Sequence, residues 1–296
     1  MYKFGYNYFY IAKDVYMPLV TLKKLITQAE ANKTAVGAFS VGNMEMVIGA
    51  VKAAEKTNTP IIIQIAEVRL PTSPIEIIGP MMVAVAKNSS VDICVHLDHG
   101  LNYETVEKAL EIGFSSVMLD GSLLSFEDNI RLTQKVVSKA KEYGASVEAE
   151  LGVVGGNEGD GKAHNIQCTD PYAAKEFCDK TGIDALAVAI GNAHGHYKVQ
   201  PELRLDILKQ IDDTCDTPLV LHGGTGITPD IFRECIRNGV RKVNIATASF
   251  DAVTNAARDT TSIENANYFK LSAAMAEAVC ENVEKHIKIF NMKDYE

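Results

Sequence analysis

The sequence of 296 residues lacks the long apolar run that a membrane-spanning helix requires, since no stretch approaches about 18 consecutive apolar residues. It also lacks an excess of positive charge, because the formal net charge is −9 and the pI is near 5.4. Nucleic acids and anionic membranes favour a basic face, so neither is expected as a partner. A small molecule is the better expectation, and an anionic one would need locally arranged donors or a metal ion.

The six cysteines are scattered, and no two of them form a Cys-x-x-Cys pair. This usage is typical of a reduced, cytoplasmic protein. The first sixteen residues hold seven of the 21 aromatic residues but lack the apolar core and cleavage site of a signal peptide. We therefore expect a disordered leader over residues 1–16. A first helix should follow Met17, with Thr21 as its N-cap and its end near Ala31.

From residue 35 onward, short apolar runs rich in Val and Ile alternate with amphipathic stretches, which indicates βα units on a parallel sheet. The runs cover residues 35–41, 60–66, 92–97, 115–119, 145–151, 185–190, 218–221 and 240–246. Helical stretches fit between them, for example 43–56, 103–111, 126–143, 171–180 and 229–238. Eight units in this length predict an α/β fold of the TIM-barrel class, a closed (β/α)8 barrel. We expect it to form one domain over residues 17–296, with C-terminal helices after the last strand.

An open, doubly wound sheet is the alternative fold. Its dinucleotide-binding version expects a Gly-x-Gly-x-x-Gly turn after the first strand, and that turn here is Val41-Gly42-Asn43. The sequence also shows no low-complexity segment and no linker that would divide the chain. The unusually long connection over residues 152–169 is rich in glycine, as functional loops often are.

In a barrel, the carboxyl ends of all strands meet on one face, and catalytic groups come from several of them. Polar residues end or follow six of the predicted strands: Asp98, His99, Asp120, Glu148, Glu150, Asn192, His194, His222, Asn244 and Thr247. Adjacent residues of a regular strand point to opposite faces, so Asp98 and His99 cannot both point inward from one. We therefore expect the chain to turn into a loop beside them.

Three imidazoles at separate strand ends, without partner cysteines, suit Zn²⁺, which in catalytic sites takes three protein ligands and keeps an open position. We assign His99, His194 and His222 as the ligands. His96 and His196 remain alternatives, because each lies two or three residues from an assigned ligand.

A phosphate site is expected after the last two strands. Gly223-Gly224-Thr225-Gly226 precedes Thr228-Pro229, which has the form of a helix start, so backbone N–H groups would face a bound anion. Residues 244–247 add side-chain donors at the position where barrel phosphate sites commonly lie. A plain tight turn is the alternative interpretation of the glycines.

A metal beside a phosphate site suggests that the ion polarises a carbonyl group while a carboxylate removes the adjacent proton. A Schiff-base route would instead need a buried lysine at a strand end. Lys242 comes too early in its run and Lys198 lies in a loop, so the metal route is favoured.

Six motifs in order resemble those of the class II, zinc-dependent ketose-bisphosphate aldolases, whose fructose-bisphosphate and tagatose-bisphosphate members share a barrel. The resemblance covers residues 17–290 and rests on HLDHG (96–100), SSVMLDGS (115–122), SVEAELG with GG (146–156), DALAVAIGNAHG (184–195), PLVLHGGTG (218–226) and KVNIAT (242–247). It implies a reversible cleavage of fructose 1,6-bisphosphate or a close relative into dihydroxyacetone phosphate and an aldehyde, through a metal-stabilised enediolate.

The resemblance also implies a role for each matching residue. His99, His194 and His222 match the zinc ligands, while Asp120 and Glu150 match a second or displaced metal position. Asp98 matches the residue that exchanges a proton with the C4 hydroxyl group, and Glu158 matches the base at C3 of dihydroxyacetone phosphate. The ketone's phosphate would be held by Gly195, Gly223, Gly224, Thr225, Asn244, Ala246 and Thr247. The family further allows a monovalent cation and implies a homodimer or homotetramer.

The sequence departs from the family pattern where the aldehyde half would bind. Phe39-Ser40 replaces Phe-Asn after the first strand, and Ala66 replaces a serine after the second. The Asp-Pro-Arg segment near the C-terminus, which helps to bind the second phosphate, is replaced by residues 263–269. A different ketose 1-phosphate is therefore an alternative substrate, with Arg69 as a hypothetical anion contact or an ordinary surface arginine. A barrel hydrolase, suggested by His194-Gly195-His196, and a non-catalytic sugar-phosphate binder are more distant alternatives.

Overall fold

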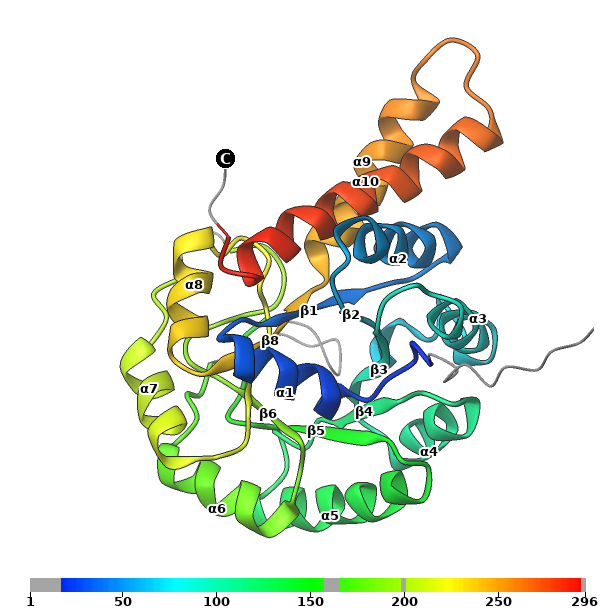
Figure 1. The fold of residues 1–296 in the computed structure, drawn as a ribbon. Helices are drawn as coiled ribbons and strands as arrows, with labels where there is room; N and C mark the ends of the chain where they lie inside the picture. Colours follow the sequence, from blue (N-terminus) through cyan, green and yellow to red (C-terminus); the bar gives the residue numbers. More distant parts are fainter. Residues whose placement is uncertain (1–16, 157–165, 198–200, 294–296) are drawn as a thin grey trace, which may run out of the picture.

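The computed structural model describes residues 17–156, 166–197 and 201–293. Its eight parallel strands form a closed barrel in which each strand pairs with the next and β8 returns to β1 (Figure 1). The predicted (β/α)8 barrel is confirmed. The leader predicted over residues 1–16 lies outside the described residues.

The strands are short and, except for the last residue of β5, fully buried. A parallel strand covered on both faces reads as a continuous apolar run, which is why the runs are visible in the sequence. The strands are β1 (Val36–Ser40), β2 (Ile61–Ala66), β3 (Ile93–Gly100), β4 (Ser116–Leu119), β5 (Ser146–Leu151), β6 (Ala185–Val188), β7 (Leu219–Leu221) and β8 (Val240–Ile245).

The helices form the outer layer of the barrel, and several begin at the caps that the sequence suggests. Thr21 caps the first helix by accepting a hydrogen bond from the Lys24 amide, and Thr228 accepts one from Ile231 at the start of α8. The helices are α1 (Leu22–Asn32), α2 (Met44–Thr57), α3 (Ile75–Lys87), α4 (Tyr103–Ile112), α5 (Phe126–Glu142), α6 (Pro171–Thr181), α7 (Leu205–Thr214), α8 (Pro229–Arg237), α9 (Thr247–Thr261) and α10 (Tyr268–Phe290), with a 3-10 turn η1 at Glu67–Arg69.

The barrel interior has an apolar end and a polar end. Helix α1 lies across the amino-terminal end of the strands (Figure 1), where its apolar side chains pack against alternate strand residues such as Ala38, Ile62 and Cys94. Two residues further along the same strands, the interior positions are Ser40, Gln64 and His96, which lie beside one another. Because the side-chain period of a strand is two, both sets face the interior.

Helices α9 and α10 form a hairpin that packs against α2 and projects beyond the barrel (Figure 1). The tip of this arm carries Tyr268 and Phe269, whose exposed fractions are 63% and 80%. Within the described ranges, no helix is both long enough and apolar enough to cross a membrane.

Candidate metal centre

The end of β3 places two adjacent functional side chains on the same side of the barrel. The strand continues through Gly100, so the prediction that the chain leaves it as a loop beside Asp98 was wrong. Instead, the register with β4 shifts between Leu97 and Gly100, and His99 has a φ of 41°, in the left-handed region. A bulge of this kind re-aims a side chain within a strand. Asp98 and His99 therefore both reach the interior without a loop.

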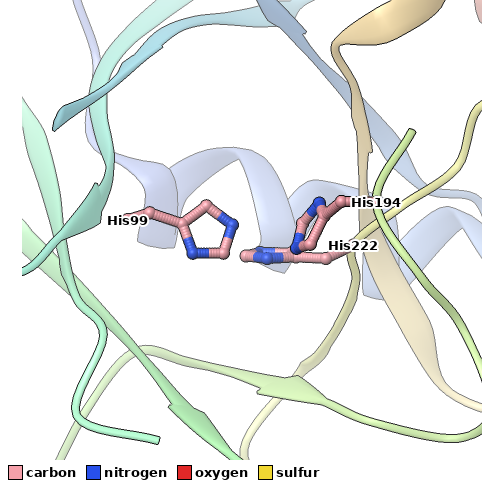
Figure 2. Close-up of side chains that lie close together, drawn as sticks. All are labelled: His99, His194 and His222. Atoms are coloured by element: carbon pink, nitrogen blue, oxygen red, sulfur yellow. The ribbon is translucent and has the colours of Figure 1, made fainter. Parts of the chain in front are cut away.

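Three imidazoles meet at the carboxyl end of the barrel. His99, His194 and His222 each offer a nitrogen that lies within 4.8 Å of the others. The ring of His99 is 4.9 Å from that of His194 and 4.6 Å from that of His222, measured between centroids. Figure 2 shows the three rings turned toward one another, His99 from the end of β3 and His194 and His222 from the segments that follow β6 and β7.

The hydrogen bonds of two of these rings leave one nitrogen of each available to a metal ion. Nδ1 of His99 lies 2.8 Å from Oδ2 of Asp120, and Nε2 of His222 lies 2.9 Å from Oε1 of Glu148. The opposite nitrogens, Nε2 of His99 and Nδ1 of His222, are buried without a hydrogen-bond partner, as is Oε2 of Glu150. Carboxylates that orient metal-binding histidines in this way are usual at metal sites. The donor set therefore fits a metal ion.

The local charges agree with a site built for a cation. Burial lowers the pKa of His222 well below its ordinary value, which favours the neutral imidazole that a metal needs. Burial alone would also lower the pKa of His99, but the carboxylates of Asp98 and Asp120 raise it well above the usual range. Burial, with a further contribution from Asp120, raises the pKa of Glu150. The positive charge of His99 offsets part of the negative charge of Asp98 and Asp120, and a divalent cation would offset more of it.

A second group of potential ligands adjoins the first. His99, Asp120 and Glu150 also place one donor atom each within 4.8 Å of one another. Asp120 is held by the backbone amide and hydroxyl group of Ser122 as well as by His99. Asp120 and Glu150 are the residues for which a second or displaced metal position was predicted.

Asp98 is 2% exposed, and both of its carboxylate oxygens are held by amide groups. Nε2 of Gln64 donates to Oδ2 at 2.8 Å, and Nδ2 of Asn244 donates to Oδ1 at 3.0 Å. Gln64 also lies 3.3 Å from the Ser40 hydroxyl group. The carboxylate of Asp98 is thus fixed in position beside the histidine cluster.

A pocket lies against Asp98 and His194. Its remaining lining is the set for which phosphate binding was predicted: Gly195, Gly223, Gly224, Thr225, Asn244, Ala246 and Thr247. Gly223 has a φ of +66°, and a Cβ atom there would lie 2.2 Å from the carbonyl oxygen of Ala193, so only glycine fits. Helix α9 begins at Thr247, so its positive dipole end faces the pocket. A helix start of this kind is a common place for an anion to bind.

Two charged residues that follow Ala66, Glu67 and Arg69, have different surroundings. Glu67 accepts hydrogen bonds from the backbone amides of Leu101 and Asn102, next to the start of α4, so it serves the structure locally. Arg69 lies over the ring of Phe250, with its guanidinium carbon 5.5 Å from the ring centroid, at a pocket of about 320 Å³. Its role as an anion contact stays a prediction.

Other predicted residues lie elsewhere. His196, the alternative ligand, is exposed and forms an ion pair of 3.0 Å with Asp251. His96 is buried inside the barrel, with Nδ1 2.8 Å from the hydroxyl group of Ser116. Glu158, the predicted base, lies outside the described residues.

The sequence interpretation missed the side chains that support the site. Lys242 comes early in its run and so has no role in the sequence interpretation, yet it is fully buried within the barrel and ion-paired with Glu148. Gln64 has no role in that interpretation either. A signal was present, because Lys242 precedes Asn244 by two residues and therefore faces the same side of β8.

These features are those of a (β/α)8-barrel enzyme with a candidate metal centre beside a pocket suited to a small anion. A family profile described as fructose-bisphosphate aldolase class-II matches residues 20–295. The fructose-bisphosphate aldolase of Staphylococcus aureus (strain Mu50 / ATCC 700699) is 38% identical over 279 residues, 93% of this chain and 98% of its own length. That of Giardia intestinalis is 36% identical over 287 residues, covering 94% of this chain and 87% of its own length.

The crystal structure of the YdjI aldolase from Escherichia coli K12 has a TM-score of 0.83 at 34% identity, and the match covers 92% of this chain and 97% of that one. The chain therefore belongs to the class II fructose-bisphosphate aldolase family, and the protein is a lyase of the aldolase type.

Proposed function

We propose that this protein reversibly cleaves fructose 1,6-bisphosphate, or a close relative, into dihydroxyacetone phosphate and an aldehyde, with Zn²⁺ held by His99, His194 and His222. The observation that carries the proposal is the position of Asp98. This carboxylate lines the glycine-rich pocket together with His194, whose ring lies 4.9 Å from that of His99, so a substrate in the pocket would lie against both Asp98 and the histidine cluster. The relatives' names supply fructose bisphosphate, whereas dihydroxyacetone phosphate is what the family resemblance implies.

The choice of Zn²⁺ follows from the donor set. Three imidazoles without a thiolate are a common catalytic zinc site, and a nearby carboxylate such as Glu150 can complete the coordination or hold the ion when it moves. When bound, the ion would supply a Lewis acid that polarises the carbonyl group of the ketone half.

The chain's own residues account for the remaining steps. Gly223, Gly224 and the start of α9 would hold the ketone's phosphate and so fix the substrate relative to Asp98. Each oxygen of Asp98 accepts one hydrogen bond and keeps a further acceptor position, so it can receive the proton of the C4 hydroxyl group. As that proton leaves, the C4 oxygen forms the carbonyl group of the aldehyde, the bond between C3 and C4 breaks, and its electron pair stays on the ketone half. Glu158 would then return a proton to C3 of the ketone half.

The aldehyde half could differ from that of fructose 1,6-bisphosphate. Ser40 lies at the end of β1, and its neighbours Gly42 and Asn43 line the pocket that contains Arg69. This observation favours a second candidate, an aldolase for another ketose 1-phosphate.

The proposal is tested by removing the metal with a chelator and restoring it. Cleavage of fructose 1,6-bisphosphate should stop and return with Zn²⁺, while activity that survives complete metal removal would contradict the mechanism. Condensation of dihydroxyacetone phosphate with a panel of phosphorylated and unphosphorylated aldehydes would separate the two candidates. Metal-dependent hydrolysis without carbon–carbon cleavage would indicate the hydrolase alternative, and binding without turnover the non-catalytic one.

We further propose that the protein is a homodimer or homotetramer in the cytoplasm. The exposed tip of the α9–α10 arm supports assembly, because exposed aromatic residues of this size often mark a protein interface. The scattered cysteines support a reducing compartment. Light scattering after size-exclusion chromatography and cell fractionation would test the two statements.

A further inference from the structure

A lysine lies within the polar part of the barrel interior, where it joins two parts of the site. The side chain of Lys242 is fully buried. Its Nζ lies 2.9 Å from Oε2 and 3.2 Å from Oε1 of Glu148, and 2.7 Å from Oδ1 of Asn244. Lys242 has no assigned role in the motifs or in the proposed mechanism.

The hydrogen bonds of Lys242 connect first to His222, a predicted metal ligand. The Glu148 carboxylate that pairs with Lys242 lies 2.9 Å from Nε2 of His222. A carboxylate only accepts hydrogen bonds, so Nε2 must carry the proton and Nδ1 must carry the lone pair. Nδ1 makes no hydrogen bond, and the carboxylate oxygen on its side, Oε2 of Glu150, lies 3.4 Å away, farther than the 2.9 Å between Nε2 and Glu148. The ion pair therefore selects the tautomer of His222 that can bind a metal.

The hydrogen bonds of Lys242 connect also to Asp98. An ammonium group only donates, so it holds the oxygen end of the Asn244 amide toward itself. The NH₂ end then faces Asp98, and Nδ2 donates to Oδ1 at 3.0 Å. If the amide turned over, its oxygen would face the carboxylate and repel it.

We propose that Lys242 is a positioning residue, which through Glu148 and Asn244 sets the tautomer of His222 and the orientation of Asp98. The inference rests on the metal and proton-transfer roles proposed above for these two residues. A role in stability alone would not require the pair, because apolar side chains of similar volume commonly stabilise an interior at least as well as a buried ion pair. A donor-only cation, by contrast, can fix the direction of two hydrogen-bonded groups at once.

The test compares Lys242→Met with Arg241→Met. Arg241 precedes Lys242 on β8 and is also buried and ion-paired, but its partner is Glu30 on α1, away from the site. Zinc affinity is measured on the metal-free proteins by competition with a chromophoric chelator. We expect a loss of about 10- to 100-fold for Lys242→Met, as is usual for residues that orient metal ligands, and less than a twofold change for Arg241→Met.

The tautomer of His222 is a second readout, and it would not change if Lys242 had only a structural role. With ¹⁵N-labelled histidine, the metal-free parent protein should show His222 protonated at Nε2 alone, and Lys242→Met should show a mixture of tautomers. At saturating zinc, Lys242→Met should also retain a kcat at least tenfold below that of the parent, because Asp98 is no longer held. A folded Lys242→Met protein with the parent's zinc affinity and a single Nε2–H tautomer would overturn the proposal.

Lys242→Met leaves Glu148 as an unpaired buried charge and could fail to fold for that reason. The double variant Lys242→Met/Glu148→Gln removes both charges and should fold. Because a glutamine amide can present either end to His222, its zinc affinity should still fall by about tenfold or more. Parent-like affinity in the folded double variant would contradict the inference. If the parent binds zinc but cleaves no ketose phosphate, the proposed function fails, while the affinity and tautomer comparison still decides the role of Lys242.

Discussion

The two ends of the barrel interior are built from the same strands, yet they do different work. At the amino-terminal end, Ala38, Ile62 and Cys94 pack with α1 into an apolar plug. Two residues further along are Ser40, Gln64 and His96, of which Gln64 donates hydrogen bonds to Ser40 and to Asp98 beside the histidine cluster. Burial of apolar area stabilises the first region, whereas the second contains buried charges that stabilise only when paired. On each of these strands, therefore, the residue that stabilises the fold and the residue that serves the site are only two positions apart.

The largest expected effect on activity comes from substituting a predicted metal ligand at the polar end. His194→Gln should lower kcat/KM by about 10⁴-fold or more, because the metal and its Lewis acidity are lost, while the unfolding free energy of the metal-free protein should change by about 1 kcal/mol or less. Steady-state kinetics, metal analysis and urea unfolding measure the three quantities. His196→Gln is the matched control, since this histidine is exposed and should leave activity unchanged. Inactivity of the control with full activity of His194→Gln would reverse the assignment.

Asp98→Asn tests the same end without removing a metal ligand. We expect kcat to fall by about 10²- to 10⁴-fold, the usual contribution of a proton-transfer group, with the zinc content unchanged. The variant should still exchange the C3 proton of dihydroxyacetone phosphate with solvent deuterium, because that step is assigned to Glu158. NMR would follow the exchange, and full cleavage activity in the Asp98→Asn variant would remove Asp98 from the mechanism.

Ile62→Ala breaks the apolar end. Ile62 is fully buried in the plug, so the substitution should lower the unfolding free energy by about 2–5 kcal/mol. The kcat of the folded fraction should match that of the parent at a temperature well below the transition. A comparable loss of kcat without a loss of stability would show that the two ends are not separable.

His286 is a buried histidine away from the metal centre, so it tests whether the surroundings of a histidine determine its role. It lies outside the barrel, among Phe39, Phe232 and Phe290. Burial lowers its pKa to about 4, against a backbone hydrogen bond to Asn282 that raises it. The unfolded chain therefore binds a proton that the folded protein does not, between about pH 6.5 and 4, and stability falls as the pH falls through that range.

By this linkage His286 should account for about 3 kcal/mol of acid destabilisation. His286→Gln keeps a donor for the Asn282 carbonyl and removes the titration, so its unfolding free energy should depend less steeply on pH between 6.5 and 4. Urea unfolding at a series of pH values measures the slope. An unchanged slope in His286→Gln would show that His286 does not titrate differently on folding.

Most of the fold was predictable because each strand of a covered parallel sheet is a self-contained apolar run with helical stretches on either side. The strand boundaries differ from the predictions by few residues, and β3 differs the most. Its extension to Gly100 depends on a register shift against β4, which is a property of two strands and not of one. No local pattern in residues 93–100 specifies that shift.

The sequence by itself determined the barrel, the order of the strands and the end at which polar residues collect, because period-two and helical patterns are local. Only the tertiary structure decided which atoms of those residues meet. That Lys242 neutralises Glu148, that Asn244 turns its NH₂ group to Asp98, and that His99 points inward depend on closing the barrel, which brings β3, β5, β7 and β8 around one interior. The physical reason is that a hydrogen bond has direction and a buried charge needs a partner, and both conditions are met only between strands that are distant in the chain.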